Sequence, residues 1–266
     1  MSSELNKILY TGNYAPNYPI NTSPRQNYSD NFFIATDNLA KYTTQDGIIR
    51  LYRANPNISQ ILSQHAMPAM LNMEGLNRVM EEHALSTQKT ALGIAQNLPF
   101  NMYALSDNRA LRDAAYLHDL GKVFIPREIL DKNGKLTPYE QKIMHTHSEL
   151  GYELLRTTNL DKKTLNLIRN HHQNALKTGY PNVNKEFFAD LNLQILSLAD
   201  KYSALTEKRS YKAPMSRNQA LGTLYKDVQN GLINPIVYNA LVKYTTPQCS
   251  GILFNGGYSI INNHKV

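Results

Sequence analysis

Several features that mark other protein classes are missing from this 266-residue sequence. It has a single cysteine, Cys249, which excludes an internal disulfide framework and suits a reducing compartment. No run approaches 18 apolar residues, which argues against a membrane-spanning helix. The first residues, MSSELNKILYTG, show no basic region followed by an apolar stretch, so no signal peptide is expected. We therefore expect a soluble, cytoplasmic protein that has no membrane partner.

A concentrated charge of one sign is also missing. The chain has 28 Lys and Arg against 21 Asp and Glu, a formal net charge of +7, and the basic residues are scattered. A basic surface favours an anionic partner such as a nucleotide. The sequence has neither zinc-finger spacing nor an RNP-like aromatic motif, so no nucleic-acid polymer is expected as a partner.

Hydrophobic periodicity divides the chain into three segments. Residues 1–56 are rich in Asn, Tyr, Pro and Thr without a sustained period, and we interpret them as an irregular extension. Its apolar stretch DGIIRLY, residues 46–52, can pack on the main body. Residues 57–245 have helical periodicity and no competing strand-like alternation, so this body is predicted to be all-α. Residues 246–266 are typical of a loop or a short hairpin. The best-defined helices are predicted at 107–122, 137–157, 161–173, 189–206, 216–229 and 234–244.

Polar side chains interrupt several of the apolar helix faces. His118 and Asp119 lie within AAYLHDLGKVFIP, where each would lose hydration unless a hydrogen bond or a metal ion replaces the water. A single histidine of this kind is more often a satisfied core residue than a ligand. Seven such groups on five helices instead favour convergence around cations. The other five are His83, His147, His171, His172 and Asp200.

The composition of this set indicates the kind of metal site. Imidazole and carboxylate without thiolate favour catalytic divalent ions such as iron, manganese, cobalt or zinc over a structural zinc site. Seven donors are too many for one small ion with an open position and suit two, with Asp119 placed to bridge them. Such two-metal sites clamp the attacking and leaving oxygens of a phosphoryl displacement. The remaining histidines are interpreted as surface or loop residues: His65, His145 and His264.

With these motifs assembled, the sequence resembles the HD-GYP family, a bacterial branch of the HD phosphohydrolases. The resemblance covers roughly residues 75–245 and rests on four motifs in order: AAYLHDLGKVFIPREIL, GKLTPYEQKIMHTHSELGYELL, HHQNALKTGYP and LADKYSALTEKRSYKAPMS. It implies an all-α HD-domain helical bundle. It also implies metal-dependent hydrolysis of the phosphodiester bonds of cyclic di-GMP, to pGpG or GMP. The expected cofactors are two divalent ions, iron or manganese.

The resemblance also implies roles for individual residues. Asp119 would bridge the two ions, and a bridging hydroxide would be the nucleophile. Lys122 would join Asp119 as a catalytic residue by stabilising developing phosphoryl charge. Arg209 and Lys212 would hold the phosphates, and Tyr180 would contact the dinucleotide. The implied metal ligands are His83, His118, Asp119, His147, His171, His172 and Asp200.

Three departures from the family pattern concern the surroundings of the site. The family reads HHE and then DG before GYP, whereas this chain has Gln173, Leu176 and Lys177 at those positions. The family usually has a second acidic residue after the last ligand, Asp200, and this chain has Ser203 at that position. Some members support a third metal with a glutamate at a position that is Val79 here, so two ions are favoured over three.

A fourth departure concerns His83. Its distance along the chain to the HD pair is three residues longer than the family usually shows, and strict spacing would place Ser86 at the ligand position. We prefer His83, because its register puts Thr87, Ala91 and Ile94 on one buried face. The extra residues then fall in the loop LPFNMYALSD.

Two other functions are compatible with these departures. The altered loop before GYP fits a hydrolase of another cyclic dinucleotide or nucleotide. The same loop, with the unusual N-terminal extension, fits a catalytically weak sensor that binds cyclic di-GMP. The GYP loop, residues 179–181, is also the place where a signalling protein partner would be expected to bind.

Overall fold

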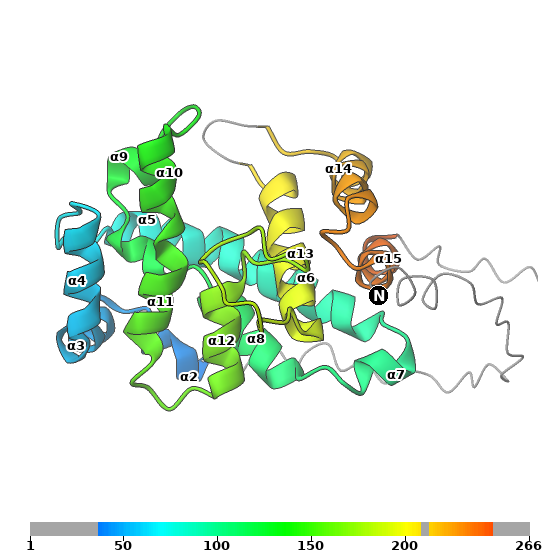
Figure 1. Ribbon diagram of the computed structural model, residues 1–266, viewed down its shortest axis with the longest axis horizontal. Coiled ribbons are helices and arrows are strands. Elements are labelled where there is room, and N and C mark those ends of the chain that lie inside the picture. The colour runs from blue at the N-terminus through cyan, green and yellow to red at the C-terminus, as the bar shows by residue number, and fades with distance from the viewer. Residues whose placement is uncertain (1–36, 209–212, 247–266) are drawn as a thin grey trace, which may run out of the picture. The chain divides into compact units, whose positions relative to one another are not determined.

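The computed structural model describes residues 37–208 and 213–246, which belong to a compact unit that begins at Thr36 (Figure 1). Within these two ranges the chain is all-α, as predicted, and has no strand. Two short elements, η2 and η3, have π- and 3₁₀-helical geometry. In chain order the elements are α2 (Asp37–Ala40), α3 (Gln45–Ala54), α4 (Pro56–Gln64), α5 (Met73–Arg78), η2 (Val79–Ala84), α6 (Leu85–Gln96), α7 (Phe100–Tyr103), α8 (Asn108–Leu117), η3 (Leu120–Phe124), α9 (Arg127–Leu130), α10 (Pro138–His145), α11 (His147–Leu155), α12 (Lys162–Asn170), α13 (Leu191–Thr206), α14 (Arg217–Gln229) and α15 (Pro235–Thr245).

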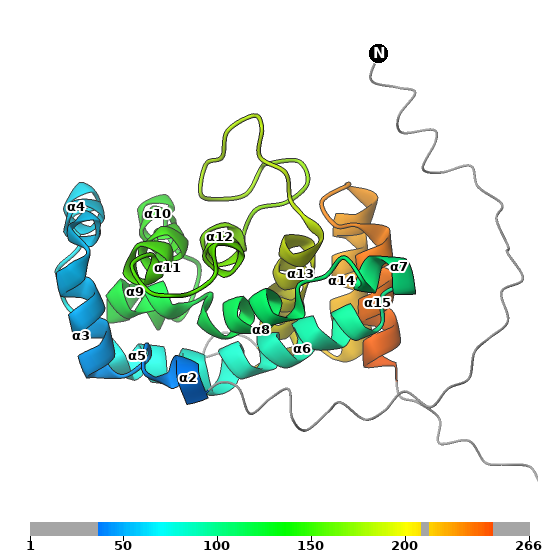
Figure 2. The ribbon, with the colours of Figure 1, turned by 90° about the horizontal axis from the view of Figure 1, so that it is seen from below.

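Helices α6, α8 and α13 form the centre of the structure. Helix α6 packs against α8, α13 and α15, and α8 also contacts α12 (Figures 1 and 2). The face of α6 that periodicity predicted as buried is confirmed, since Thr87, Ala91 and Ile94 are inaccessible to solvent. Burying a large aliphatic side chain such as Ile94 stabilises the fold by roughly 1.5–3 kcal/mol. This core fixes the helix ends from which the polar residues of interest project.

The six helices predicted with defined limits are all present, with two of them interrupted. The predicted helix 107–122 is α8 followed by the 3₁₀-helix η3, and 137–157 is α10 and α11 divided at Thr146. Helix α10 begins with a capping box, in which the Thr137 hydroxyl accepts from the Glu140 amide and the Glu140 carboxylate accepts from the Thr137 amide. Both interruptions place a polar residue at a helix end. The tail 247–266, predicted as a loop or hairpin, lies outside the described residues.

The N-terminal part of the described chain differs from the prediction. The segment up to residue 56 was expected to be irregular, but residues 45–54 form helix α3, which packs with α4 against α11. Thr44 caps α3 by accepting a hydrogen bond from the amide of Gly47. The expected packing of residues 46–52 on the body is confirmed by Ile48, which is fully buried. The apolar residues Ile48, Leu51 and Tyr52 lie at helical spacing, and this short signal was overlooked among the Asn-, Pro- and Tyr-rich residues before it.

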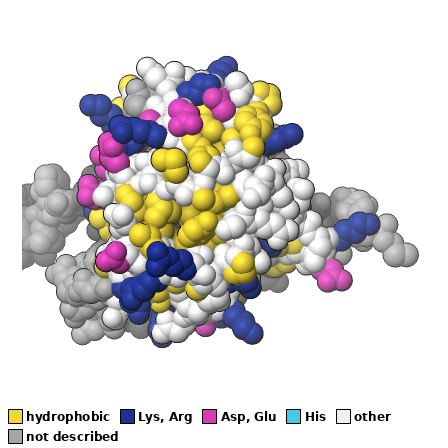
Figure 3. All heavy atoms as spheres, turned by 90° about the vertical axis from the view of Figure 1, so that its left-hand side faces the viewer, with side chains coloured by type: hydrophobic (Ala, Val, Ile, Leu, Met, Phe, Trp, Pro, Cys, Tyr) yellow, Lys and Arg dark blue, Asp and Glu magenta, His cyan; other side chains and the backbone are white. Residues whose placement is uncertain are grey.

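The outer side of α3 and α4 carries exposed apolar surface. Hydrophobic side chains gather in the centre of the face shown in Figure 3, on the side of the molecule where these helices lie. Helices α3 and α4 bury only part of Leu51, Tyr52 and Ile61 against the core. Across the described ranges, no helix combines the length and the apolarity needed to cross a bilayer.

Candidate metal centre

The structure brings all seven predicted metal ligands into one cluster. They come from five places in the fold: the π-helix η2, the end of α8, the start of α11, the end of α12 and the middle of α13. Six of the seven are buried, and the side chain of His172 is 24% exposed. Their convergence matches the prediction from apolar helix faces, while their role as ligands stays a prediction. The residues, in chain order, are His83, His118, Asp119, His147, His171, His172 and Asp200.

The cluster has two halves on either side of Asp119. The histidine half consists of His147, His171 and His172, in which Nε2 of His147 lies 3.2 Å from Nε2 of each of the other two rings. The carboxylate half consists of His83, His118 and Asp200. Here Oδ1 of Asp200 lies 3.0 Å from Nε2 of the first ring and 3.9 Å from Nε2 of the second. In each half the three donor atoms lie within 4.8 Å of one another, close enough to hold an ion, and His118, Asp119 and His171 form a third such group that spans the two halves.

Asp119 faces both halves, one carboxylate oxygen toward each. Its Oδ1 lies 3.3 Å from Nε2 of His147 and 4.0 Å from Nε2 of His171. Its Oδ2 lies 3.5 Å from Nε2 of His83 and 3.4 Å from Nε2 of His118. This is the arrangement that a carboxylate bridging two ions would require, so the geometry supports the predicted role.

Backbone carbonyls orient three of the histidines in the same way. Nδ1 of His118, His147 and His171 lies 2.9, 2.6 and 2.7 Å from the carbonyl oxygen of the residue three positions earlier. These histidines adjoin the last turns of α8, α10 and α12, where carbonyl oxygens lack intrahelical partners. Each Nδ1–H donates to a carbonyl, which leaves Nε2 as the atom that faces the cluster.

The donor atoms fit a cation and are poorly satisfied by one another. With both Nδ1 atoms protonated, the Nε2 lone pairs of His147 and His171 face each other at 3.2 Å. Nε2 of His118 and Oδ1 of Asp119 are buried without a hydrogen-bond partner among the described residues. Orphaned buried acceptors of this kind are costly unless a positive charge satisfies them. The residues present therefore fit the divalent ions that imidazole and carboxylate donors prefer.

The protonation states of the histidine half suit metal binding. Burial lowers the pKa of His147 to about 4 and that of His171 to about 3, and it holds the pKa of His172 well below its ordinary value. Burial alone would raise the pKa of Asp119, but the charges of Lys122 and His118 keep that pKa well below its usual range. Near neutral pH this half consists of neutral imidazoles beside an ionised carboxylate, which is the state that ions bind.

His83 belongs to the cluster and lies within the π-helix η2, an element often found at functional sites. The alternative ligand, Ser86, instead donates its hydroxyl to Oγ of Ser203 at 3.3 Å. Burial would lower the pKa of His83, but hydrogen bonds to Asp200 and Glu207 raise it to about 9. The preference for His83 over Ser86 therefore agrees with the position of both side chains.

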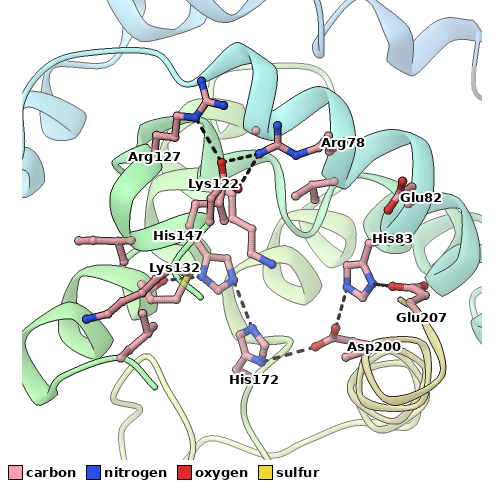
Figure 4. Close-up of a pocket in the computed structure, with 18 of the residues that line it drawn as sticks. Arg78, Glu82, His83, Lys122, Arg127, Lys132, His147, His172, Asp200 and Glu207 are labelled. Atoms are coloured by element: carbon pink, nitrogen blue, oxygen red, sulfur yellow. Dashed lines mark hydrogen bonds and ion pairs between the residues drawn. The ribbon is translucent and has the colours of Figure 1, made fainter. Parts of the chain in front are cut away.

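Glu207 is a site residue that sequence reasoning missed. Its Oε2 lies 2.8 Å from Nδ1 of His83, on the opposite side of the ring from Asp200 (Figure 4). One signal was available, because Glu207 follows Ser203 by one helical turn and Ser203 lacks the acid that the family pattern expects there.

A cavity of about 760 Å³ opens onto the cluster. His147, His172 and Asp200 line one side of it, and Lys122 lies beside them with Nζ 2.6 Å from Oδ2 of Asp119. The opposite wall carries basic residues that were not predicted, among them Arg78, Arg127 and Lys132 (Figure 4). Arg78 forms a two-point hydrogen bond to the Asp131 carboxylate, at 2.5 and 2.7 Å.

The GYP loop forms another part of the cavity rim. The Tyr180 ring lies 4.5 Å from the His172 ring and stacks on His145 at 3.7 Å, with 10° between the planes. His145 is exposed and outside the cluster, as predicted. The Gln173 amide, in place of the usual acid, donates to the carbonyl of Pro181 and so ties the loop to the end of α12. The predicted phosphate-binding residues Arg209 and Lys212 lie outside the described residues.

Two glycines allow backbone segments to approach within the site. A Cβ at Gly179 would lie 2.0 Å from the carbonyl oxygen of His172, and one at Gly121 would lie 2.0 Å from the carbonyl oxygen of His147. Only glycine therefore lets η3 lie against α11 at this distance. That contact brings Asp119, two residues before Gly121, to the start of α11.

Comparison with known proteins identifies the family. A model described as HD domain matches residues 59–237. A 3'3'-cGAMP-specific phosphodiesterase 2 of Vibrio cholerae is 37% identical over 45% of this chain and 24% of its own length. A cyclic di-GMP phosphodiesterase of Thermotoga maritima is 31% identical over 65% of this chain and 47% of its own length. The cyclic di-GMP phosphodiesterase response regulator RpfG of Xanthomonas campestris is 36% identical over 51% of this chain and 36% of its own length.

These curated relatives are much longer, and the chain spans less than half the length of each. A solved structure titled Bd1817, a HDG"Y"P protein from Bdellovibrio bacteriovorus, aligns over 80% of this chain and 62% of that one. Its TM-score is 0.52 at 16% sequence identity, a likeness of fold. Since the family model covers more than half of the chain, this protein belongs to the HD domain family, and its resemblance to the HD-GYP branch is confirmed.

Proposed function

We propose that this protein hydrolyses a phosphodiester bond of a cyclic dinucleotide, with cyclic di-GMP as the expected substrate, and that it needs two divalent ions, iron or manganese. One observation carries the proposal: the two oxygens of Asp119 face the two halves of the cluster, beside a cavity that the cluster residues line. The relatives support the substrate class, because their names specify phosphodiesterases of cyclic di-GMP or of 3'3'-cGAMP.

The residues divide the work of such a reaction between them. The two halves would hold one ion each, and Asp119 would touch both. Bound divalent ions would lower the pKa of a water molecule and neutralise phosphoryl charge. Lys122 lines the cavity within hydrogen-bond distance of Asp119, so its ammonium group can donate to a phosphate oxygen as negative charge develops there.

The rim of the cavity supplies binding groups for the rest of a nucleotide. The Tyr180 ring packs over His172, where it can stack on a base. Burial raises the pKa of Tyr180, so its hydroxyl stays protonated and can donate a hydrogen bond. A volume of about 760 Å³ falls within the range of roughly 300–1,000 Å³ that small-molecule sites commonly show. Arg209 and Lys212 keep their predicted role in holding phosphates.

A second candidate substrate is another cyclic dinucleotide such as 3'3'-cGAMP. The relatives include enzymes named for either molecule, and the loop before GYP carries Gln173 and Lys177 instead of the family residues. The Gln173 amide contacts the backbone at Pro181, and Lys177 has a φ of 59°. The loop next to Tyr180 therefore differs in sequence and contacts from the family pattern, and we expect the preference for one base over another to differ with it.

The proposal is tested by turnover of a substrate panel. Protein purified without oxygen is reconstituted with Fe²⁺ or Mn²⁺, its metal content is counted, and cyclic di-GMP, 3'3'-cGAMP and cyclic di-AMP are offered separately. Cleavage of cyclic di-GMP to pGpG or GMP with about two ions per chain is expected from the two halves. Protein that holds two ions and binds cyclic di-GMP tightly without forming product would contradict hydrolysis and favour the sensor function.

Two expectations stay predictions beside this function. The GYP loop, residues 179–181, is proposed as the contact for a signalling protein partner, which a binding assay with candidate proteins and a Tyr180→Ala variant would test. The expected cytoplasmic location would be tested by fractionation of cells.

A further inference from the structure

We infer that Glu207 is a positioning residue that fixes the tautomer of His83, so that Nε2 of this ring is free to bind the ion of the carboxylate half. The inference rests on the metal role in the proposed function and deepens it. Glu207 is not one of the predicted ligands, and its role would be to orient one of them, His83. The reason is a difference between His83 and the three histidines that backbone carbonyls orient, His118, His147 and His171.

His83 has no helix end to orient it. His118, His147 and His171 each place Nδ1 on a carbonyl oxygen three residues earlier, at helix ends where such oxygens are available. His83 lies inside the continuous stretch formed by α5, η2 and α6, where the backbone carbonyls accept hydrogen bonds of the helix itself. Its Nδ1 instead meets Oε2 of Glu207, 2.8 Å away.

Two carboxylates face the two nitrogens of His83, and an ion can bind Nε2 only when the proton of this nitrogen has left and the ring keeps its other proton on Nδ1. Asp200 lies 3.0 Å from Nε2, and Glu207 lies 2.8 Å from Nδ1. If the proton sits on Nε2, it donates to Asp200 and the nitrogen cannot bind an ion. If it sits on Nδ1, it donates to Glu207 and the Nε2 lone pair points at Asp200 and Asp119, where the ion of this half would lie. Glu207 is thus the group that favours the productive tautomer.

Helix α13 supplies both the ligand and the orienting group from one face. Asp200, Ser203 and Glu207 follow one another at spacings of three and four residues, which places them on one stripe of the helix. Ser203 is fully buried and its hydroxyl oxygen accepts from the hydroxyl of Ser86. Glu207 forms the C-cap position of α13, with its side chain 19% exposed. The chain lacks a carboxylate at Ser203 but has one at Glu207, one turn later, within hydrogen-bond distance of Nδ1 of His83.

The test is a Mn²⁺ titration of the full chain, with free Mn²⁺ measured by electron paramagnetic resonance. Wild type is expected to bind two ions. Glu207→Ala is expected to weaken one ion by about 10–100-fold and leave the other unchanged, the size usual for loss of a group that orients a metal ligand. Glu207→Gln keeps an oxygen that accepts from Nδ1 but loses the charge, so its loss should be smaller than that of Glu207→Ala.

Glu81→Gln is the matched control. Glu81 is an exposed carboxylate two residues before His83 on the same π-helix, so this variant removes the same charge from the same region. Its two ions should bind as in wild type. Equal weakening by Glu81→Gln and Glu207→Gln would reduce the effect to net charge and overturn the inference, as would unchanged binding in Glu207→Ala.

A second readout separates positioning from a purely structural role. In Zn²⁺-loaded protein, ¹⁵N NMR of the imidazoles should show the His83 proton on Nδ1 in wild type and in Glu207→Gln. A wild-type ring protonated on Nε2 would overturn the inference. Thermal unfolding of the metal-free variants checks that each one folds. Neither readout requires turnover, so a protein that binds two ions but cleaves no cyclic dinucleotide would refute the proposed function and leave this inference standing.

Discussion

The two halves of the candidate metal centre reach similar donor geometry by different means. The histidine half takes its side chains from α11 and the end of α12, and backbone carbonyls orient His147 and His171. The carboxylate half gathers His83, His118 and Asp200 from η2, α8 and α13, three separate elements. Glu207 provides there what a helix end provides on the other side. His118 in the carboxylate half is also oriented by a backbone carbonyl, so the contrast between the halves rests on His83 and its partner Glu207.

The electrostatic difference between the halves follows from the same contrast. Burial drives the histidine half toward uncharged imidazoles, with pKa values of about 4 for His147 and about 3 for His171. His83 is equally buried, yet the carboxylates of Asp200 and Glu207 raise its pKa to about 9. An ion entering the histidine half finds free lone pairs, whereas an ion entering the carboxylate half must displace a proton.

The largest expected effect removes the group that joins the two halves. Asp119→Asn should abolish detectable turnover, a loss of at least about 10³-fold, because both ions lose a shared ligand. Metal analysis of the purified variant should show fewer than two ions per chain. Asp113→Asn is the matched control, since Asp113 is a buried carboxylate on α8 that pairs with Arg112 outside the cluster. Two ions retained by Asp119→Asn would refute the bridging role.

Next in size are variants that empty one half at a time. His147→Ala and His83→Ala should each lower the number of tightly bound Mn²⁺ ions from two to one. Loss of a nitrogen that binds the ion directly should weaken affinity by more than the roughly 10–100-fold seen when a group that orients a ligand is lost. Titration with free Mn²⁺ measured in solution gives the count. His145→Ala, which alters only the ring stacked on Tyr180, should keep both ions. Loss of both ions from either ligand variant would show that the halves do not act separately.

A pH series sharpens the comparison without any substitution. Below a pKa of about 9 the proton on His83 competes with the ion, so Mn²⁺ affinity of the carboxylate half should rise about tenfold per unit between pH 6.5 and 8.5. The histidine half, whose rings are neutral well below this range, should change little. In His147→Ala the surviving ion should keep this dependence, and in His83→Ala it should lose it. If Mn²⁺ affinity depends equally on pH in both variants, the assignment of this dependence to His83 is wrong.

The smallest expected effect concerns the backbone contact that brings Asp119 to the histidine half. Gly121→Ala should lower the free energy of unfolding by about 1–3 kcal/mol, because its Cβ would overlap the carbonyl oxygen of His147. Urea unfolding of the metal-free protein measures this change. Gly222→Ala on α14 meets no atom within 4 Å and should instead raise the free energy of unfolding by about 0.5–1 kcal/mol. A neutral result for Gly121→Ala would mean that η3 can shift freely against α11.

Sequence reasoning reached the seven residues that cluster in the structure because the unusual feature was local. Each histidine or carboxylate interrupts an apolar helix face, and such interruptions are visible as soon as the period of the helix is known. The same reasoning kept His83 over Ser86 because the buried face of α6 fixes the register. It failed for helix α3, a ten-residue helix that follows an irregular stretch and whose Ile48 is fully buried.

Glu207, despite its spacing after Ser203, and the basic wall of the cavity were not predicted because their contacts are long-range. A glutamate at a helix end and arginines such as Arg78 look like ordinary solvated charges in a sequence. Their position depends on which elements the fold places opposite them: η2 faces Glu207, and the segment after α9 faces Arg78 through Asp131. Contacts between residues 53 or 124 positions apart leave no periodic signal.

The sequence by itself determined the helical class, the chemical type of the donors and the family, because helix periodicity and motif spacing are properties of neighbouring residues. Only the tertiary structure decided how the donors divide into two halves, which nitrogen of each ring faces inward, and that Glu207 stands behind His83. These depend on helix packing and on close approaches such as that at Gly121, where the distance between two backbones, and not the order of residues, sets the geometry.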